Sequence, residues 1–183
     1  MKKEFNITIF SENSIGLLNR ITINFTRRKI NIESLTVSAS AYQGISKFII
    51  VVNDTEERVQ RVVAQLDKLV DVLKAYYNTN ESLIYQEIAL YKVPSEYLLN
   101  GNNVVETLVR ESGARILEIN NQYAVIEKTG HTDETQALFA KLSKDFNCTQ
   151  FVRSGRIAIT RSPVEKLSVF LKERDAMLSQ IED

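Results

Sequence analysis

The stretch that organises the chain is a loop that turns directly into a helix: Glu12-Asn13-Ser14-Ile15-Gly16-Leu17-Leu18-Asn19-Arg20-Ile21. Before it, residues 4–10 alternate between apolar and polar side chains, a pattern typical of a strand. After it, Leu18, Ile21 and Phe25 recur at helical spacing, which predicts a helix with one buried face. The chain therefore opens with a strand, a glycine-bearing loop and a helix.

The loop has the residue types of a small anion site. Asn13 or Ser14 suits the N-cap position, and Gly16 lacks a Cβ where another group would approach the backbone. Free N–H groups and the positive end of the helix dipole favour an anion at such a helix start, and a carboxylate fits them. An ordinary capped turn between a strand and a helix has the same residues, so the pattern alone leaves both interpretations open.

Composition narrows the classes of partner. The chain has 23 basic and 23 acidic residues, and this balance argues against binding along a phosphate backbone, which needs clustered Lys and Arg. The apolar run at residues 48–52 lacks the alternation of basic and aromatic side chains that is typical of RNA-binding sheets, which stack bases on their aromatic residues. No apolar run approaches the length of a membrane span, and residues 1–5 show no signal region. We expect a cytoplasmic protein that binds neither nucleic acid nor membrane.

Residues that commonly carry catalysis or bind metals are scattered. His131 stands alone in a polar loop. Cys148, the single cysteine, lies in a predicted strand and is expected to be a small buried residue. The pair Glu56-Glu57 sits at a predicted helix start, where carboxylates favour the dipole. We therefore expect no catalytic residue, no metal site and no cofactor in this chain.

Residues 1–78 predict the element order βαββαβ, with further strands at 30–37, 46–53 and 70–77. Right-handed crossovers fold this order into a four-stranded antiparallel sheet with two helices on one face, the ferredoxin-like sandwich. The second strand is then an edge, which is a liability unless it is covered. Pairing two such edges about a two-fold axis gives a side-by-side dimer, in which Asn31 reaches the helix start of the other subunit.

Residues 83–183 repeat the plan after a polar linker at 78–82. A strand at 84–93 is followed by a loop to residue 103 and a helix, and then by a hairpin, a second helix, two short strands and a final helix after Pro163. The predicted fold class is α+β, with two tandem ferredoxin-like βαββαβ domains at 1–78 and 83–183.

Several runs together resemble one family. They are the opening stretch, Asn31-Ile32-Glu33-Ser34-Leu35-Thr36-Val37, Gln65-Leu66-Asp67-Lys68-Leu69-Val70-Asp71-Val72, Glu87-Ile88-Ala89-Leu90-Tyr91-Lys92-Val93 and Val152-Arg153-Ser154-Gly155-Arg156. In this order they are similar to the regulatory small subunit of acetolactate synthase, also called acetohydroxyacid synthase. The glycine loop alone would suggest only an ACT domain, the amino-acid-sensing module.

The resemblance implies a site for a branched-chain amino acid, valine foremost, at the interface of a homodimer. The backbone amides around Gly16 and Leu17 would hold the ligand carboxylate, and Asn13 would add hydrogen bonds, with Asn31 doing so from the other subunit. An apolar wall would surround the ligand side chain. The complete expected set is Asn13, Ser14, Ile15, Gly16, Leu17, Leu18, Asn31 and Ile32.

The same resemblance implies a chain without catalysis of its own. It would activate the large catalytic subunit, which carries thiamine diphosphate, magnesium and FAD, and would transmit feedback inhibition by valine in branched-chain amino acid biosynthesis. Ile15 lies in a variable pair before Gly16, so ligand selectivity can differ from the family's pattern. Ser38 stands where the family often has a small apolar residue near the site, which can alter the sensitivity to the ligand. Two alternatives stay open: a free-standing ACT-type sensor of another partner, and a structural subunit that has lost ligand binding.

Overall fold

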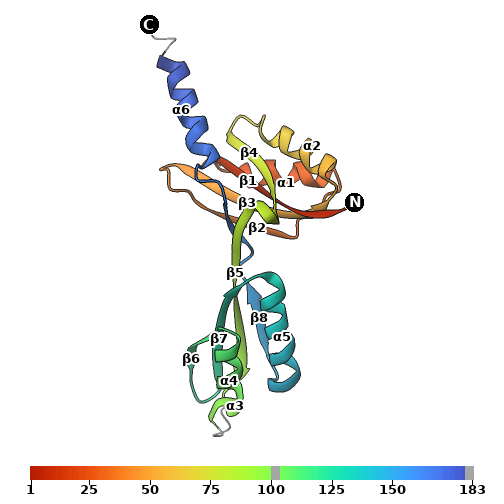
Figure 1. The fold of residues 1–183 in the computed structure, drawn as a ribbon, viewed down its shortest axis with the longest axis vertical. Coiled ribbons are helices and arrows are strands. Elements are labelled where there is room, and N and C mark those ends of the chain that lie inside the picture. The colour runs from red at the N-terminus through yellow and green to blue at the C-terminus, as the bar shows by residue number, and fades with distance from the viewer. Residues whose placement is uncertain (100–103, 180–183) are drawn as a thin grey trace. The chain divides into compact units, whose positions relative to one another are not determined.

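The computed structural model describes residues 1–99 and 104–179, so the end of the expected loop before residue 104 lies outside the described residues. Figure 1 follows the chain through its elements. The first elements are β1 (Lys3–Glu12), α1 (Leu17–Arg27), β2 (Ser34–Ala39), β3 (Ile45–Asp54), α2 (Glu56–Leu66), β4 (Val72–Thr79) and the 3₁₀ turn η1 (Asn80–Ser82). They are followed by β5 (Leu83–Pro94), α3 (Glu96–Leu99), α4 (Val104–Glu111), β6 (Arg115–Ile119), β7 (Tyr123–Gly130), α5 (Thr132–Phe146), β8 (Gln150–Arg153), β9 (Ile157–Thr160) and α6 (Lys166–Ser179).

Both halves have the predicted ferredoxin-like topology. Within the described residues, the first sheet has the strand order β2-β3-β1-β4, and the second has the equivalent order β6-β7-β5-β8, with β9 pairing with β5. The strand pairs whose registers are resolved, β1 with β3 and β4, β2 with β3, β5 with β7 and β8, and β6 with β7, are antiparallel. The α+β fold class with two βαββαβ units is therefore confirmed, and β2 is an edge strand as expected.

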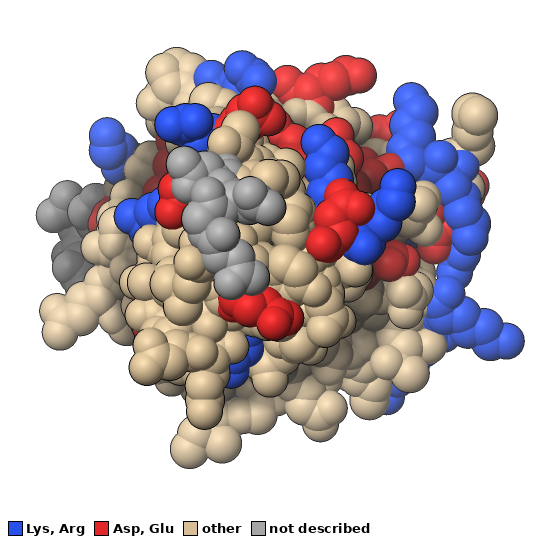
Figure 2. Space-filling model, turned by 90° about the horizontal axis from the view of Figure 1, so that it is seen from below, with Lys and Arg blue, Asp and Glu red and all other residues tan. Residues whose placement is uncertain are grey.

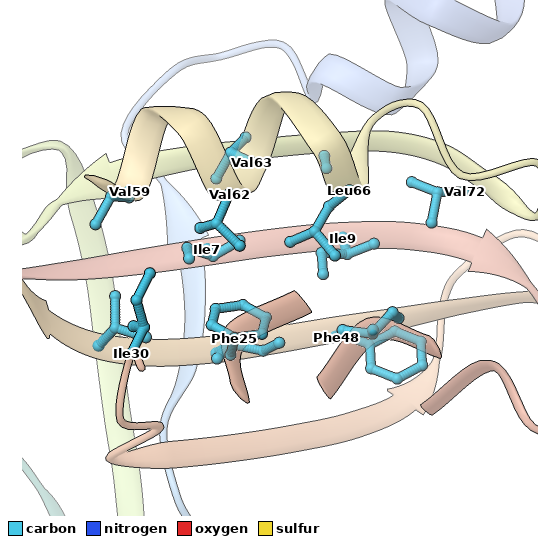
Figure 3. Close-up of a cluster of buried hydrophobic side chains, with 14 of the residues drawn as sticks. Ile7, Ile9, Phe25, Ile30, Phe48, Val59, Val62, Val63, Leu66 and Val72 are labelled. Carbon is cyan, nitrogen blue, oxygen red and sulfur yellow. The ribbon is translucent and has the colours of Figure 1, made fainter. Parts of the chain in front are cut away.

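The main core of the first sheet lies under α1 and α2. Ile7 and Ile9 alternate along β1 and are fully buried. In Figure 3, Val62 and Leu66 of α2 point from the helix toward these two strand residues. The apolar stripe of α1, Leu17, Ile21 and Phe25, packs into the same core. The expected helices therefore pack on one face of the sheet, but the expectation that Leu18 belongs to the buried stripe of α1 is wrong: Leu17 takes that place, and Leu18 is 47% exposed.

The opposite face of the first sheet is also covered. Thr8 and Phe10 of β1 are buried although they point away from the helices. Phe10 and Tyr76 pack with Leu167 at the start of α6, which is fully buried. The segment that leads into α6 therefore packs on the second face of the first sheet, and this explains why β3 is apolar on both of its faces.

The chain divides into two compact units. One contains residues 1–85 together with the described residues from Arg156 onward, and the other is the continuous segment Gln86–Gly155. This division differs from the expected domains 1–78 and 83–183, because the last part of the chain groups with the first unit. The second unit is an insertion between two parts of the first.

The Val152-Arg153-Ser154-Gly155-Arg156 run lies where the chain leaves the second unit. Arg153 pairs with the buried carboxylate of Glu87 at 3.1 Å, within the second unit. The Ser154 hydroxyl accepts a hydrogen bond from the Ile88 N–H at 3.0 Å. Gly155 takes a φ of 78°, the left-handed region that favours glycine. The next residue, Arg156, is 5% exposed and belongs to the first unit.

Arg156 holds the returning chain through a buried polar cluster. Its guanidinium donates to Glu4 Oε1 at 2.8 Å and to the side-chain oxygens of Asn6 and Asn80, both at 3.1 Å. The guanidinium also stacks on the ring of Tyr85 at 3.9 Å from the ring centroid. A buried guanidinium needs such acceptors, since its five N–H donors are costly to leave unpaired.

Two general features complete the description of the fold. Among the described helices, none is both long and apolar enough to cross a lipid bilayer. On the face of the molecule shown in Figure 2, acidic and basic side chains lie beside one another, without a field of one sign.

Candidate functional site

The loop between β1 and α1 is held by backbone hydrogen bonds from three directions. Glu12 N–H donates to Asp71 O and Asn13 N–H donates to Gly44 O, each at 3.0 Å. Within the loop, Ser14 N–H donates to Glu12 O, also at 3.0 Å. The loop therefore has a defined conformation, as a preformed binding loop requires.

Gly16 sets the start of the helix. It is the N-cap residue of α1, with a φ of 81° and a ψ of −2°, and no side chain caps the helix. The expectation that Asn13 or Ser14 is the N-cap is wrong, because the helix begins only at Leu17. The left-handed conformation at Gly16 turns the chain into the helix without needing a side-chain cap.

This geometry leaves room beside the helix start. A Cβ placed on Gly16 would have no atom within 4 Å, so the space next to the loop is open. The first N–H groups of a helix have no partner inside the helix, and here the Leu17 N–H makes only a long 3.4 Å contact with Ser14 O. Weakly bonded amides at the positive end of a helix dipole are suited to a carboxylate.

Arg20 adds a positive charge to the loop that the sequence pattern had not singled out. Its guanidinium donates to Ser14 Oγ at 3.1 Å and pairs with the carboxylate of Asp71. The side chain is half-exposed. Arg20 lies four residues after Gly16, and the distance of one helical turn is the signal that would have suggested it.

The expected apolar residues are divided between core and surface. Leu17 is buried in the core, and Ile32 is partly buried against it. Ile15 is fully exposed and Leu18 is 47% exposed. Only the latter two present free apolar surface near the loop, so one chain supplies an incomplete wall for an apolar ligand side chain.

Asn31 lies beyond the other end of α1. The helix has 11 residues, which at 1.5 Å per residue makes it about 16 Å long. Asn31 is exposed and donates from its amide to Glu33 Oε1 at 2.9 Å. A single chain therefore brings together Asn13, Ser14 and Gly16 but not Asn31.

Side chains with shifted pKa values are engaged in structural contacts. Burial raises the pKa of the Tyr91 hydroxyl, which donates to Thr135 O at 2.8 Å. Burial likewise raises the pKa of the Cys148 thiol, so both groups stay protonated at neutral pH. The Thr129 hydroxyl lowers the pKa of Glu127. Within the described ranges, no three His, Cys, Asp or Glu residues gather as a metal site would require.

Comparison with known proteins identifies both halves. Residues 7–74 match the family model described as the AHAS small subunit-like ACT domain. Residues 86–162 match the model described as the small subunit of acetolactate synthase. The second match ends just after β9, and the first contains the Gly16 loop.

Full-length relatives agree with these models. The acetolactate synthase small subunit of Bacillus subtilis (strain 168) is 32% identical over 169 residues, which cover 92% of this chain and 95% of the relative. The probable acetolactate synthase small subunit of Archaeoglobus fulgidus is 33% identical over 155 residues, covering 85% and 95%.

A solved structure supports the same relationship. The acetolactate synthase small subunit from Thermotoga maritima aligns with a TM-score of 0.78 at 26% identity, covering 88% of this chain and 99% of that one. Because sequence identity, coverage and fold agree over nearly the whole length, this chain belongs to the acetolactate synthase small subunit family.

Proposed function

We propose that the chain is the non-catalytic regulatory subunit of acetolactate synthase, which activates the catalytic large subunit and makes it sensitive to valine. Its relatives carry the name of small subunit, and the first half is an ACT domain. The large subunit would hold thiamine diphosphate, magnesium and FAD, and would carry out the reaction.

The observation that carries the sensor proposal is the arrangement around α1. Gly16 opens the helix with accessible amides, and Asn31 follows the other end of the same helix. If two chains pair through their β2 edges about a two-fold axis, the two α1 helices run antiparallel. The Gly16 loop of each chain then lies beside Asn31 of the other chain. A homodimer therefore supplies two complete sites, whereas a single chain supplies none.

Exposed apolar side chains support this pairing. Val37 on the β2 edge is 43% exposed, and Leu18 on α1 is 47% exposed. Apolar surface along an edge strand is a liability in a monomer and is covered in a paired sheet. In the dimer, Leu18 would also help to enclose the side chain of valine.

Feedback inhibition then follows from linkage. Valine that contacts two subunits favours one dimer arrangement, and the catalytic subunit favours another. Such a coupling is typically about 1–3 kcal/mol, which corresponds to roughly a 5- to 150-fold change in affinity. The coupling is reciprocal, so the large subunit must change the affinity for valine by the same factor.

The test is reconstitution with the cognate catalytic subunit. Acetolactate formation from pyruvate is followed with and without this chain, and with and without valine. We expect activation that valine reverses. Activation that valine leaves unchanged would contradict the sensor proposal, and no activation would favour a free-standing ACT-type sensor that acts on another partner.

A variant addresses the composite site. Asn31→Ala is expected to abolish inhibition by valine while leaving activation largely intact, because it removes the hydrogen bonds given across the interface and, within the chain, only an exposed contact with Glu33. Asn121→Ala, at an exposed turn between β6 and β7, is the matched control. An Asn31→Ala protein that is inhibited by valine with unchanged sensitivity would remove this residue from the site.

A further inference from the structure

A second hollow lies on the face of the first sheet that α1 and α2 do not cover. Its volume is about 260 Å³. Thr8, Lys47 and Tyr76 line it from three neighbouring strands, and Ile159 and Glu165 line it from the segment that leads into α6. All of these residues belong to the first unit. The hollow is therefore separate from the loop at the start of α1.

Lys47 is unusual within this hollow. Its side chain is only 20% exposed, and its ammonium lies 3.7 Å from Glu165 Oε1 and 5.3 Å from the centre of the Phe10 ring. In the part of the chain that the structure describes, no acceptor lies within hydrogen-bonding distance of Lys47 Nζ. An ammonium has three donors, and burying it without an acceptor is costly. The site favours a group that brings oxygen acceptors to Lys47.

Two hydroxyl groups complete the polar floor. Tyr76, 8% exposed, shares a hydrogen bond with the hydroxyl of Thr8. Burial, and then the charge of Glu165, raise the pKa of Tyr76 to about 12, so its hydroxyl is protonated at neutral pH and can donate. Apolar walls from Leu83 and Ile159 leave space for a small aliphatic group.

The two charges of the hollow define the class of ligand. A simple carboxylate would satisfy Lys47 but would lie against the carboxylate of Glu165. A molecule with both a carboxylate and an ammonium can pair with Lys47 and with Glu165 at the same time. These pairs replace the 3.7 Å contact between Lys47 and Glu165, which is too long for a hydrogen bond. We propose that this hollow is a binding site for a zwitterionic amino acid with a small side chain, with its carboxylate at Lys47 and its ammonium at Glu165.

The proposal does not depend on the regulatory function proposed above. It has one direct structural consequence. The ligand would contact the sheet through Lys47 and the covering segment through Glu165, so binding would tighten the attachment of that segment. The same segment continues into α6, which begins one residue after Glu165.

Methyl-resolved NMR of the full chain tests the site. Leu83 and Ile159 report on the hollow, and Leu17 and Leu18 report on the loop at the start of α1. The probes are L-alanine, L-valine and pyruvate, since pyruvate has the carbon skeleton of alanine without its ammonium. We expect an amino acid to shift the Leu83 and Ile159 signals and pyruvate to leave them unchanged. The proposal would be overturned if neither amino acid shifts the methyl signals of Leu83 and Ile159, or if pyruvate shifts them equally.

Variants separate a ligand site from an ion pair that merely holds the segment in place. Lys47→Gln is expected to weaken amino acid binding by about tenfold or more, the usual effect of losing a charge-assisted hydrogen bond. Lys47→Arg keeps the charge and is expected to retain binding. Tyr76→Phe leaves the ion pair intact and is expected to weaken binding through the lost hydroxyl.

Two outcomes of these measurements would refute the assignment. One is an unchanged affinity for the amino acid in Lys47→Gln. The other is full affinity in Tyr76→Phe, combined with a loss of binding in the Lys47 variants only when these variants are partly unfolded. Asn31→Ala serves as the reference background, because it disables the expected valine site. Shifts of Leu83 and Ile159 that persist in this background originate in the hollow itself.

Discussion

Replacing Arg156 by alanine tests whether the returning segment is an integral part of the first unit. The guanidinium of Arg156 is almost fully buried and donates to Glu4, Asn6 and Asn80 at 2.8–3.1 Å. Asn6 is itself only 1% exposed. Alanine would remove the donor and leave the side-chain amide oxygen of Asn6 buried without this hydrogen-bond partner.

The size of the loss can be worked from these contacts. A hydrogen bond from a charged donor contributes about 1.5 kcal/mol, and two such bonds reach the neutral oxygens of Asn6 and Asn80. The Glu4 side chain is 37% exposed, so its ion pair is screened and adds only about 0.5 kcal/mol. We expect Arg156→Ala to lower the free energy of unfolding of the first unit by about 3–4 kcal/mol, similar to other broken buried pairs.

Urea unfolding followed by NMR-resolved amide exchange gives this quantity for each unit separately. Amides of β1 report on the first unit and amides of β7 report on the second, which we expect to be unaffected. Arg61→Ala is the matched control, because the Arg61–Glu57 pair is more than 70% exposed on both sides and contributes less than about 0.5 kcal/mol. A loss below about 1 kcal/mol for Arg156→Ala, or an equal loss in β7, would refute the reasoning.

Three further predictions follow from particular contacts. Gly16→Ala is expected to lower the free energy of unfolding by about 1–2 kcal/mol, because position 16 has a positive φ, and also to abolish the response to valine. Gly113→Ala, at a position with a φ of 63° and equally open space, should lower the stability alone. Enzyme inhibition assays and thermal melts of both variants would separate the two effects. The pKa of Tyr76 is raised to about 12 in the folded state, so the protonated hydroxyl adds stability that is fully present below the usual pKa of tyrosine and is lost as the pH rises toward 12. In urea titrations at alkaline pH, the wild-type protein should therefore lose more stability than Tyr76→Phe. Parallel losses in the two proteins would contradict this. Thr135→Val should destabilise the second unit by about 1–3 kcal/mol, because the Thr135 hydroxyl donates to the buried Glu87 carboxylate at 2.5 Å. An unchanged urea midpoint would show that the other donors to Glu87, Arg153 and Thr132, are sufficient without Thr135.

Most strands and helices of both units could be predicted because their burial follows the local periods of the sequence. The short helix α3, at Glu96–Leu99, is an exception, because it lies in the stretch expected to be a loop. Residues 157–160 were also expected as a strand, but a short alternating run does not reveal which sheet it joins. The place of that strand depends on Arg156, and a charged residue gives no sequence signal of being 5% exposed. The sequence therefore predicts the local elements, but it does not predict which distant segments pack together.

The candidate site divides in a similar way. That a glycine loop leads into a helix could be predicted from its local signature, whereas ligand binding by Gly16 and Leu17 stays a prediction. The N-cap was misassigned, since Asn13 and Ser14 favour capping by residue type while the backbone turn at Gly16 decides where the helix begins. Arg20 was missed because its partners, Ser14 and Asp71, are brought to it by the fold. The role of Asn31 rests on a second chain and stays a prediction.

The insertion of one unit into the other also orders events during synthesis. A chain made from its N-terminus has β1 to β4 long before Leu167, the residue that packs on Phe10 and Tyr76. The continuous segment Gln86–Gly155 can close its own sheet first. Until residue 167 leaves the ribosome, the first sheet keeps an apolar face uncovered, and this nascent intermediate is the stage most exposed to aggregation and to capture by chaperones.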